Sequence, residues 1–362
     1  MKDSSVELDW TPFRAAEKRF KARFPPPDLS QDVLDLALLN ATRASEIEAG
    51  IWKGTTSGLE YRKLTGDVEA YVTPRIPGLV LLPGFLDHAT QRALVQWSLA
   101  DHARQPNETN LDIHYVLPED GLWNPSGPRK LINNTPATLE NFSELSATPK
   151  LPSAPSGTAQ PTLASALIRK LRWANIGWSY HWGTKQYDFA KGKVKVDESL
   201  AEVCRKAVNA VDWKQVYGPT DASDWGESGP GWQTWDQDYE PDAGIVNFYQ
   251  TKDTLMAHVD RSEVCATSPL VSISIGNAAV FLIGGLTRDS DPVPILLRSG
   301  DVVIMSGPTC RRAYHGVPRI LENTLPDHLT GQGPWAPYED YLTTTRININ
   351  VRQVFPKGFD PS

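Results

Sequence analysis

The segment "PLVSISIGNAAVFLIGG", residues 269–285, decides the fold class of this chain. Its first half alternates the apolar residues Val271, Ile273 and Ile275 with serines, which is the period expected of a strand with one buried face. Its second half is a short apolar run. Gly276-Asn277 lies between the halves and predicts a hairpin turn, so the segment predicts two consecutive strands.

The same pattern continues over residues 243–355, where short strand-like segments follow one another without a helix between them. The other segments are "GIVNFYQ", "LMAHVD", "VPILLRSG", "DVVIMSG", "YHGVPRI" and "TRININVRQV", and Gly300-Asp301 predicts a second hairpin turn. About eight strands in such a series indicate an antiparallel sandwich or jelly roll. We therefore expect a mainly β core, flanked by helices.

The remainder of the chain predicts additions to that core. Residues 1–75 have apolar residues at helical spacing, broken by three prolines, and predict a helical N-terminal extension. The main domain is then expected over residues 76–356. Within it, a Ser-, Thr- and Pro-rich segment at about 144–162 predicts a flexible loop. Residues 221–242 contain seven acidic and no basic residues and predict an acidic loop, which is either a cover for the site, a filter against duplex DNA or solvated surface.

The composition is that of a soluble globular protein, with 40% hydrophobic and 22% charged residues. A net charge of -7 argues against coating nucleic acid through bulk electrostatics, although the basic segment "FRAAEKRFKARF" provides a local patch or a solvated helix face. Three scattered cysteines argue against a disulfide framework. We find no signal or transit pattern and no membrane-spanning run, and expect an intracellular monomer, cytoplasmic or nuclear, without membrane contact.

The segment "TLMAHVDRSE", residues 254–263, carries the first candidate for chemistry. His258 and Asp260 are two positions apart, so on a strand both side chains point to one face and can converge on a metal ion. His315, in "RRAYHGVPRI", is a candidate third ligand. Two histidines and one carboxylate are typical of non-haem Fe(II) oxygenases. The alternative is a hydrogen-bonded histidine beside an ordinary surface aspartate.

The last predicted strand, "TRININVRQ", carries the second candidate. Four polar side chains share one of its faces: Arg346, Asn348, Asn350 and Arg352. Arginines and amides facing inward need an acidic or amide-rich partner, and a dicarboxylate would match the planar guanidinium fork. Asn247 and Tyr249, in "VNFY", also share a face and could reach the same ligand. The alternative is a solvated polar face, but a dicarboxylate site beside an Fe(II) site indicates 2-oxoglutarate.

These motifs together resemble the AlkB-type Fe(II)- and 2-oxoglutarate-dependent dioxygenases, whose pattern is Asn-x-Tyr, HxD, a distant His and RxNxxxR. The chain is most similar to the AlkB homologue 1 branch, well over residues 165–355 and more faintly over 77–120. The resemblance implies a double-stranded β-helix catalytic core. It also implies an Fe(II) site made of the catalytic residues His258, Asp260 and His315. The implied 2-oxoglutarate pocket contains Asn247, Tyr249, Arg346, Asn348 and Arg352, with Arg346 on the distal carboxylate.

The resemblance further implies a reaction and a substrate. With O2 and 2-oxoglutarate, such enzymes remove a methyl group from a nucleobase and release formaldehyde, succinate and CO2. The expected substrate is N-methyladenine in tRNA or in single-stranded or unpaired DNA. Alternatives are an oxygenase of the same fold acting on a protein side chain, and a non-catalytic nucleic-acid-binding module.

An unpaired base must be held by stacking, so aromatic residues are expected near the metal. The segment "LRWANIGWSYHW" supplies Trp178, Tyr180 and Trp182, for which the alternative role is core packing. Ser262 stands where the bacterial enzyme's pattern has an acidic base-reading residue, and Glu263 follows it. We expect these five residues on the substrate side, with lysines 185, 191, 193 and 195 along a phosphate backbone.

Overall fold

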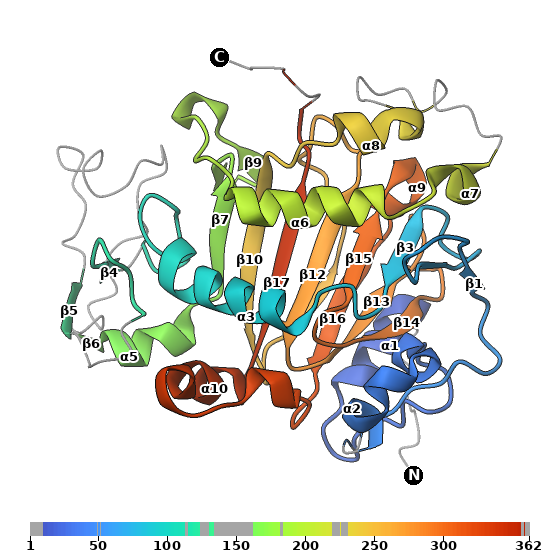
Figure 1. Ribbon diagram of the computed structural model, residues 1–362, viewed down its shortest axis with the longest axis horizontal. Helices are drawn as coiled ribbons and strands as arrows, with labels where there is room; N and C mark the ends of the chain where they lie inside the picture. Colours follow the sequence, from blue (N-terminus) through green and yellow to red (C-terminus); the bar gives the residue numbers. More distant parts are fainter. Residues whose placement is uncertain are drawn as a thin grey trace, which may run out of the picture.

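A computed structural model describes residues 10–48, 50, 52–112, 115–123, 130–133, 162–181, 184–218, 225, 231–355 and 358. Two antiparallel sheets form its centre (Figure 1). The larger sheet has eight strands, in the order β1 Arg62–Lys63, β2 Tyr71–Val72, β3 Leu79–Leu82, β15 Val302–Met305, β12 Leu270–Gly276, β17 Thr345–Arg352, β10 Ala243–Gln250 and β7 Trp173–Gly177. The smaller sheet has four, in the order β11 Leu255–His258, β16 His315–Ile320, β13 Ala279–Ile283 and β14 Val293–Leu297.

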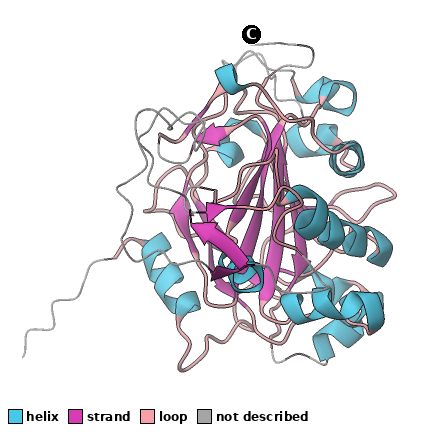
Figure 2. Ribbon diagram, turned by 90° about the vertical axis from the view of Figure 1, so that its left-hand side faces the viewer, coloured by secondary structure: helices cyan, strands magenta, loops and turns pink. Residues whose placement is uncertain are grey.

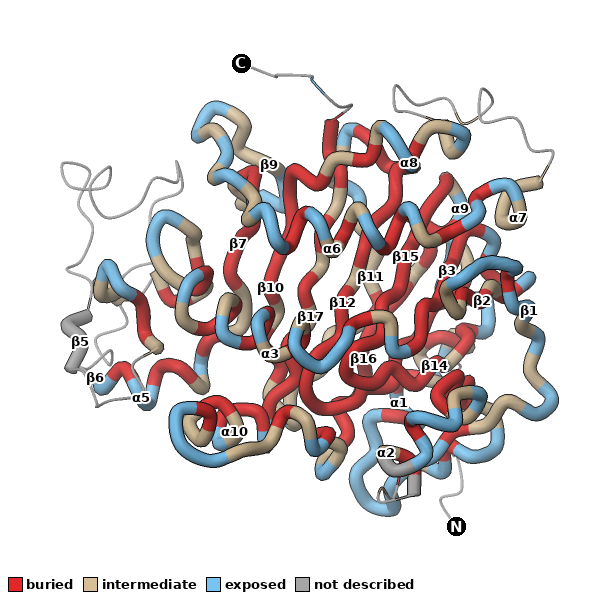
Figure 3. Tube along the Cα trace, viewed as in Figure 1, coloured by how far each residue is buried: buried red, intermediate tan, exposed pale blue. Residues whose placement is uncertain are grey.

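Helices cover the outer face of the larger sheet (Figures 1 and 3). They are α3 (His88–Gln96), which continues as a π-helix over Trp97–His102, α6 (Glu198–Asn209) and α10 (Ala336–Leu342). Apolar strand residues such as Phe248 and Ile349 pack in one core with Leu94 of α3 and Leu200 of α6. Because the apolar side chains of β10 and β17 point outward to these helices, their alternating polar side chains point to the inner face.

The two sheets pack against each other through a second group of apolar residues. This second core contains Leu79, Val303 and Met305 of the larger sheet and Ile283 and Ile295 of the smaller sheet. Figure 2 shows the sheets from the side, with the helices outside them. The eight strands predicted over residues 243–355 are all present, β10 to β17, and the mixed α+β architecture with large antiparallel sheets agrees with the expected jelly roll. The expectation of no helix between them is wrong, because α9 (Gly307–Arg311) and α10 (Ala336–Leu342) separate the last three strands.

Both predicted hairpin turns are wrong. β12 pairs with β15 and β17, whereas β13 pairs with β14 and β16, so Gly276-Asn277 carries the chain from one sheet to the other. Gly300-Asp301 likewise joins β14 of the smaller sheet to β15 of the larger sheet. Gly276 and Gly300 both have a φ of +85°, a conformation that favours glycine. Turn composition identified the direction change but not which sheet the next strand joins.

The N-terminal segment lies on the smaller sheet. Helix α1 (Pro12–Lys21) begins after Thr11, whose hydroxyl caps Arg14 N, and buries Phe13 and Phe20 against the outer face of β13 and β14. After the prolines the predicted helical extension consists of short pieces: 3-10 helices at Leu36–Leu39 and Ala41–Arg43 precede α2 (Ala44–Glu48). Leu34 instead bridges to β14, and residues 62–72 form β1 and β2.

The other elements are short. They are β4 (Tyr115–Val116), β5 (Lys130–Asn133), β6 (Thr162–Leu163), α5 (Ala164–Leu167), β8 (Tyr180–His181), β9 (Gln186–Tyr187), α7 (Trp213–Tyr217), α8 (Trp235–Asp238) and α9 (Gly307–Arg311). Residues 144–161 of the predicted flexible loop lie outside the described residues. Part of the predicted acidic loop is helical, since it contains α8 with a fully buried Trp235. None of the helices in the described ranges has the length and hydropathy needed to cross a bilayer.

Candidate metal and dicarboxylate site

The three predicted metal ligands meet on the smaller sheet. His258 ends β11, His315 begins β16, and the two residues are paired directly across these antiparallel strands. Asp260 follows two positions after His258. One ligand atom from each residue lies within 4.8 Å of the others, and His258 Nε2 is 3.7 Å from Asp260 Oδ1. The group therefore has the composition and proximity of an Fe(II)-binding facial set.

Backbone carbonyls orient both imidazoles. His258 Nδ1 is 3.0 Å from Met256 O, and His315 Nδ1 is 3.0 Å from Ala313 O. Since a carbonyl only accepts, each Nδ1 carries the proton and each Nε2 keeps a lone pair for a metal. Burial and the neighbouring His258 lower the pKa of His315 to about 4, so this imidazole is neutral and able to bind a metal at physiological pH.

Arg352 holds the carboxylate of the set. Its Nη1 donates to Asp260 Oδ2 at 3.1 Å and to Glu263 Oε1 at 2.5 Å. Burial raises the pKa of Asp260, but the charge of Arg352 and then the two imidazoles outweigh it and hold that pKa well below its ordinary value. Arg311, which is 1% exposed, lies with its Nη2 3.8 Å from Glu263 Oε1. Arg311 was not among the predicted site residues, although two adjacent arginines before a buried strand are a signal in the sequence.

Arg346 is the second part of the site. It is 1% exposed and donates to Ser274 Oγ at 2.7 Å and to Asn277 O at 3.3 Å, while its Nε has no partner among the described residues. Burial lowers the pKa of Arg346 to about 10, which leaves the guanidinium charged at neutral pH. A buried cation that contacts only neutral acceptors is costly unless an anion joins it. The observation fits a carboxylate of 2-oxoglutarate.

The expected amide and phenol residues lie beside Arg346 on the same inner face. Tyr249 of β10 pairs across the strands with Arg346, and Asn247 pairs with Asn348. Asn348 Nδ2 donates to Ser272 Oγ at 2.8 Å and to Ile273 O at 3.0 Å. Asn247 Nδ2 lies 3.4 Å from Asn348 Oδ1. These contacts fix the amides next to Arg346, where their expected role toward 2-oxoglutarate stays a prediction.

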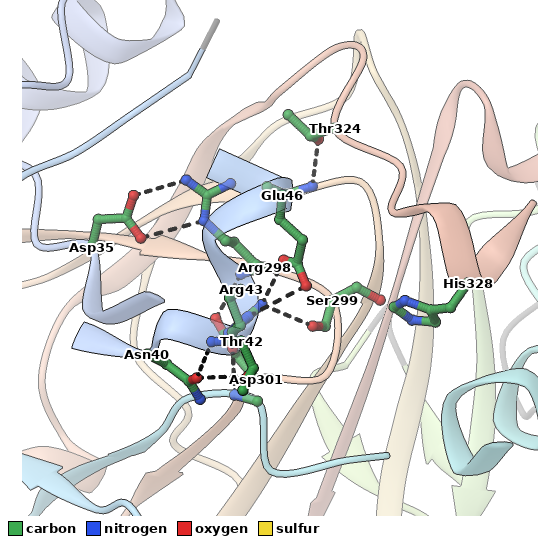
Figure 4. A network of polar contacts seen from close by, with 12 residues as sticks. Asp35, Asn40, Thr42, Arg43, Glu46, Arg298, Ser299, Asp301, Thr324 and His328 are labelled. Atoms are coloured by element: carbon green, nitrogen blue, oxygen red, sulfur yellow. Dashed lines mark hydrogen bonds and ion pairs between the residues drawn. The ribbon is translucent and has the colours of Figure 1, made fainter. Parts of the chain in front are cut away.

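A polar network that includes Ser299, Asp301 and Arg43 (Figure 4) contacts Gly276, which pairs with Arg346 across β12 and β17. Ser299 Oγ accepts from Gly276 N at 3.0 Å and donates to Gln91 of α3 at 2.7 Å. Asp301 accepts from Arg43 of the N-terminal segment at 2.5 Å and from Arg298 N at 2.7 Å. Short polar residues in a turn give no sequence signal for such a role, so this network could not be predicted.

The residues expected on the substrate side are not all equivalent. Trp178 is 5% exposed and packs edge-on against Phe189 and Phe355, at ring-centroid distances of 5.3 and 5.8 Å, so it belongs to an aromatic core. Trp182 lies outside the described residues. Tyr180 is half-buried, burial raises the pKa of its hydroxyl, and this hydroxyl lies 3.3 Å from Ser262 Oγ. The Glu263 side chain is 1% exposed and faces the two arginines.

Comparisons with known proteins agree with this geometry. A family model described as the 2OG-Fe(II) oxygenase superfamily matches residues 78–352. The tRNA demethylase abh1 of Schizosaccharomyces pombe is 31% identical over 95% of this chain and 96% of its own length. The DNA N(6)-methyladenine demethylase ALKBH1A of Arabidopsis thaliana is 28% identical over 97% of this chain and 98% of its own length. The nucleic acid dioxygenase ALKBH1 of Mus musculus is 30% identical over 80% of this chain and 68% of its own length.

Proposed function

The chain belongs to the AlkB homologue 1 branch of the 2OG-Fe(II) oxygenase superfamily and is an Fe(II)- and 2-oxoglutarate-dependent dioxygenase. We propose that it demethylates N-methyladenine in nucleic acid. Two observations carry the proposal: the ligand set His258, Asp260 and His315 on the smaller sheet, and the buried Arg346 on the inner face of the larger sheet, whose Nε has no hydrogen-bond partner among the described residues. The relatives' names supply the class of substrate.

Each part of the site has a role in this reaction. His258, Asp260 and His315 would hold Fe(II), and Arg346 would hold the distal carboxylate of 2-oxoglutarate. When bound, iron and 2-oxoglutarate supply the oxidation by O2 that converts 2-oxoglutarate into succinate and CO2 and hydroxylates the methyl group. The hydroxymethyl product then loses formaldehyde. Arg352 keeps Asp260 ionised, and the hydrogen bonds from the two Nδ1 atoms keep both imidazoles turned to the metal.

The substrate side fits an unpaired base. A methyl group on a base edge is hidden in a duplex, so the base must be unpaired or flipped and then stacked. The half-buried ring of Tyr180, which meets the Tyr187 ring edge-on at a centroid distance of 5.2 Å, would stack on such a base. The same segment carries four exposed lysines, at positions 185, 191, 193 and 195. Lys191 pairs with Glu108, and Lys193 lies over the Trp178 ring. The four lysines offer positive charge to a phosphate backbone.

The test is succinate and formaldehyde formation by purified protein with Fe(II), 2-oxoglutarate and a panel of N-methyladenine oligonucleotides in tRNA-like stem-loops and single-stranded DNA. We expect both products to rise with one methylated oligonucleotide and not with its unmethylated copy. His258→Ala should remove both signals, whereas Ser57→Ala, at an exposed position, should leave them unchanged. Turnover that ignores every oligonucleotide would favour a protein side chain as the substrate instead.

A further inference from the structure

Ser262 joins the metal-binding loop to the hairpin formed by β8 and β9. It lies two residues after Asp260, and its hydroxyl donates to Lys185 O at 2.7 Å. The hydroxyl of Tyr180 is 3.3 Å from the same Ser262 Oγ. A serine has one O–H donor, which Lys185 O occupies, so the Tyr180 hydroxyl must be the donor in the second contact. Two consecutive hydrogen bonds therefore connect the Tyr180 hydroxyl to Ser262 Oγ and the Ser262 hydroxyl to Lys185 O.

The hairpin presents the Lys185 carbonyl in a strained conformation. Lys185 has a φ of 56°, in the left-handed region that is unfavourable for a residue with a Cβ. Its N–H donates to His181 O at 2.8 Å, and His181 Nδ1 accepts from Thr184 N at 3.2 Å, which closes the turn. The strained residue and the contact with Ser262 therefore coincide. A strained conformation persists where its surroundings fix it, and the contact with Ser262 is one such constraint.

The base of the hairpin is fixed by other contacts. Tyr187, paired with Tyr180 across the hairpin, stacks on the partly buried Phe189, and both pack against the buried core of Trp178 and Phe355. Ser179 Oγ donates to Glu108 Oε2 at 3.0 Å. Loss of the Ser262 hydroxyl would therefore free the edge that faces the metal ligands while the base of the hairpin stays packed.

We propose that Ser262 is a positioning residue that fixes the hairpin, and with it the Tyr180 ring, at the distance from the metal that a methylated base requires. The inference rests on the proposed function, because it assumes that the hairpin faces the nucleic acid. It also assigns Ser262 a role other than reading the base edge, since its hydroxyl is already engaged by the protein. Substrate presentation would then depend on Ser262 while iron and 2-oxoglutarate binding would not.

The first readout is hydrogen exchange of peptides covering residues 179–188, measured in the protein with Fe(II) and 2-oxoglutarate but without nucleic acid. We expect the amides of this hairpin to exchange about tenfold faster in Ser262→Ala than in the wild type, as the loss of one to two hydrogen bonds predicts. Ser262→Thr keeps the hydroxyl and should restore slow exchange. Ser57→Ala should match the wild type. Unchanged exchange in Ser262→Ala would overturn the proposal regardless of the kinetics.

The second readout is the kinetics of demethylation. Ser262→Ala should raise KM for the methylated oligonucleotide about tenfold and leave KM for 2-oxoglutarate unchanged, with rescue by Ser262→Thr. Faster exchange with an unchanged oligonucleotide KM would overturn the positioning role while leaving the proposed function intact. A wild-type enzyme that demethylates no oligonucleotide would overturn the proposed function and the substrate part of this inference, whereas the exchange data would still decide whether Ser262 fixes the hairpin.

Discussion

The guanidinium of Arg346 is 1% exposed and donates to a serine hydroxyl and a backbone carbonyl, neither of which carries charge. Replacing a buried cation that has no charged hydrogen-bond partner in the described part of the chain with an apolar residue should not destabilise the free protein. Arg346→Leu is therefore expected to keep or raise the melting temperature in the absence of 2-oxoglutarate and to lose the stabilisation by that ligand, about 2.7 kcal/mol at one hundred times Kd. Thermal unfolding with and without 2-oxoglutarate measures both effects.

Arg169→Leu is the matched control, because Arg169 is an exposed arginine paired with Asp340. It should lose less than about 1 kcal/mol of stability and keep the full response to 2-oxoglutarate. Arg346→Lys keeps the charge but not the planar fork and should raise KM for 2-oxoglutarate about tenfold. A normal response to 2-oxoglutarate in Arg346→Leu would show that the carboxylate binds elsewhere.

Glu263 shares Arg352 with the metal ligand Asp260, since one guanidinium nitrogen donates to both carboxylates. In Glu263→Gln the buried arginines 311 and 352 would keep only one nearby carboxylate, and Arg352 would be drawn more strongly to Asp260. We expect Fe(II) to bind about tenfold more weakly, which is the low end for loss of a partner of a metal ligand. Anaerobic titration with Fe(II) measures this effect. Glu322→Gln, at the Arg319 pair, serves as control, and equal Fe(II) affinity in both variants would contradict the argument.

At the scale of elements, the corner between β12 and β13 connects backbone conformation to ligand binding. A Cβ on Gly276, at φ +85°, would lie 3.0 Å from Thr345 O and 3.3 Å from Leu342 Cδ2, beside the Asn277 carbonyl that accepts from Arg346. Gly276→Ala should lose at least about 1–2 kcal/mol of stability and also raise KM for 2-oxoglutarate. Gly58→Ala is the matched control, since Gly58 has a similar φ of +73° but a Cβ added there would have no atom within 4 Å.

Gly58→Ala should lose stability through its backbone alone and leave KM for 2-oxoglutarate unchanged. Denaturant unfolding and steady-state kinetics on the two variants separate these effects. The same KM change in both variants would mean that a general loss of stability, and not the corner, affects 2-oxoglutarate.

The elements also show what the sequence could predict. The alternation of β17 correctly placed Arg346 and Asn348 on a face opposite Ile347 and Ile349, because a strand has a fixed period of two. Helical spacing after the prolines did not show that the helix is divided into short pieces, because this depends on Asp35, which is fully buried in an ion pair with Arg298, 2.8 Å apart, and fixes this segment beside β14. Trp178 could not be assigned either, since an aromatic residue packs equally well in a core and on a base.

At the scale of the whole molecule, the N-terminal segment is connected to the site through buried charge. Arg43 pairs with Asp301 at 2.5 Å, and Asp301 also accepts from Gly84 N and Arg298 N. The backbone carbonyl of Asp301 accepts from Ser274 N, and the hydroxyl of Ser274 accepts from Arg346. Helix α1 packs on the outer face of the same smaller sheet that carries the metal ligands. The N-terminal segment therefore completes the packing around the site. The composition of residues 1–75, which predicts an extension separate from the main domain, does not indicate this role.

Two buried groups away from the metal should give the molecule opposing pH dependences. Burial lowers the pKa of His102, which stacks on Trp97, to about 4, against about 6.5 in the unfolded chain. The unfolded state then binds the proton more readily, so the stability contributed by neutral His102 is complete above pH 6.5 and is lost as pH falls through 4. Burial raises the pKa of Asp242 to about 6, so its contribution is complete below about pH 3.8 and is lost as pH rises through 6.

Single variants separate the two groups. The free energy of unfolding of His102→Phe, minus that of the wild type, should rise by up to about 3 kcal/mol as pH falls from 6.5 to 4. The same difference for Asp242→Asn should rise instead as pH increases from 4 to 6, whatever its offset from the lost contacts with Val354 N and Phe355 N. Urea unfolding of the metal-free proteins from pH 4 to 7 measures both slopes. A difference that does not vary with pH would show that the group has the same pKa in the folded and unfolded chains, since only an unequal proton affinity makes stability depend on pH.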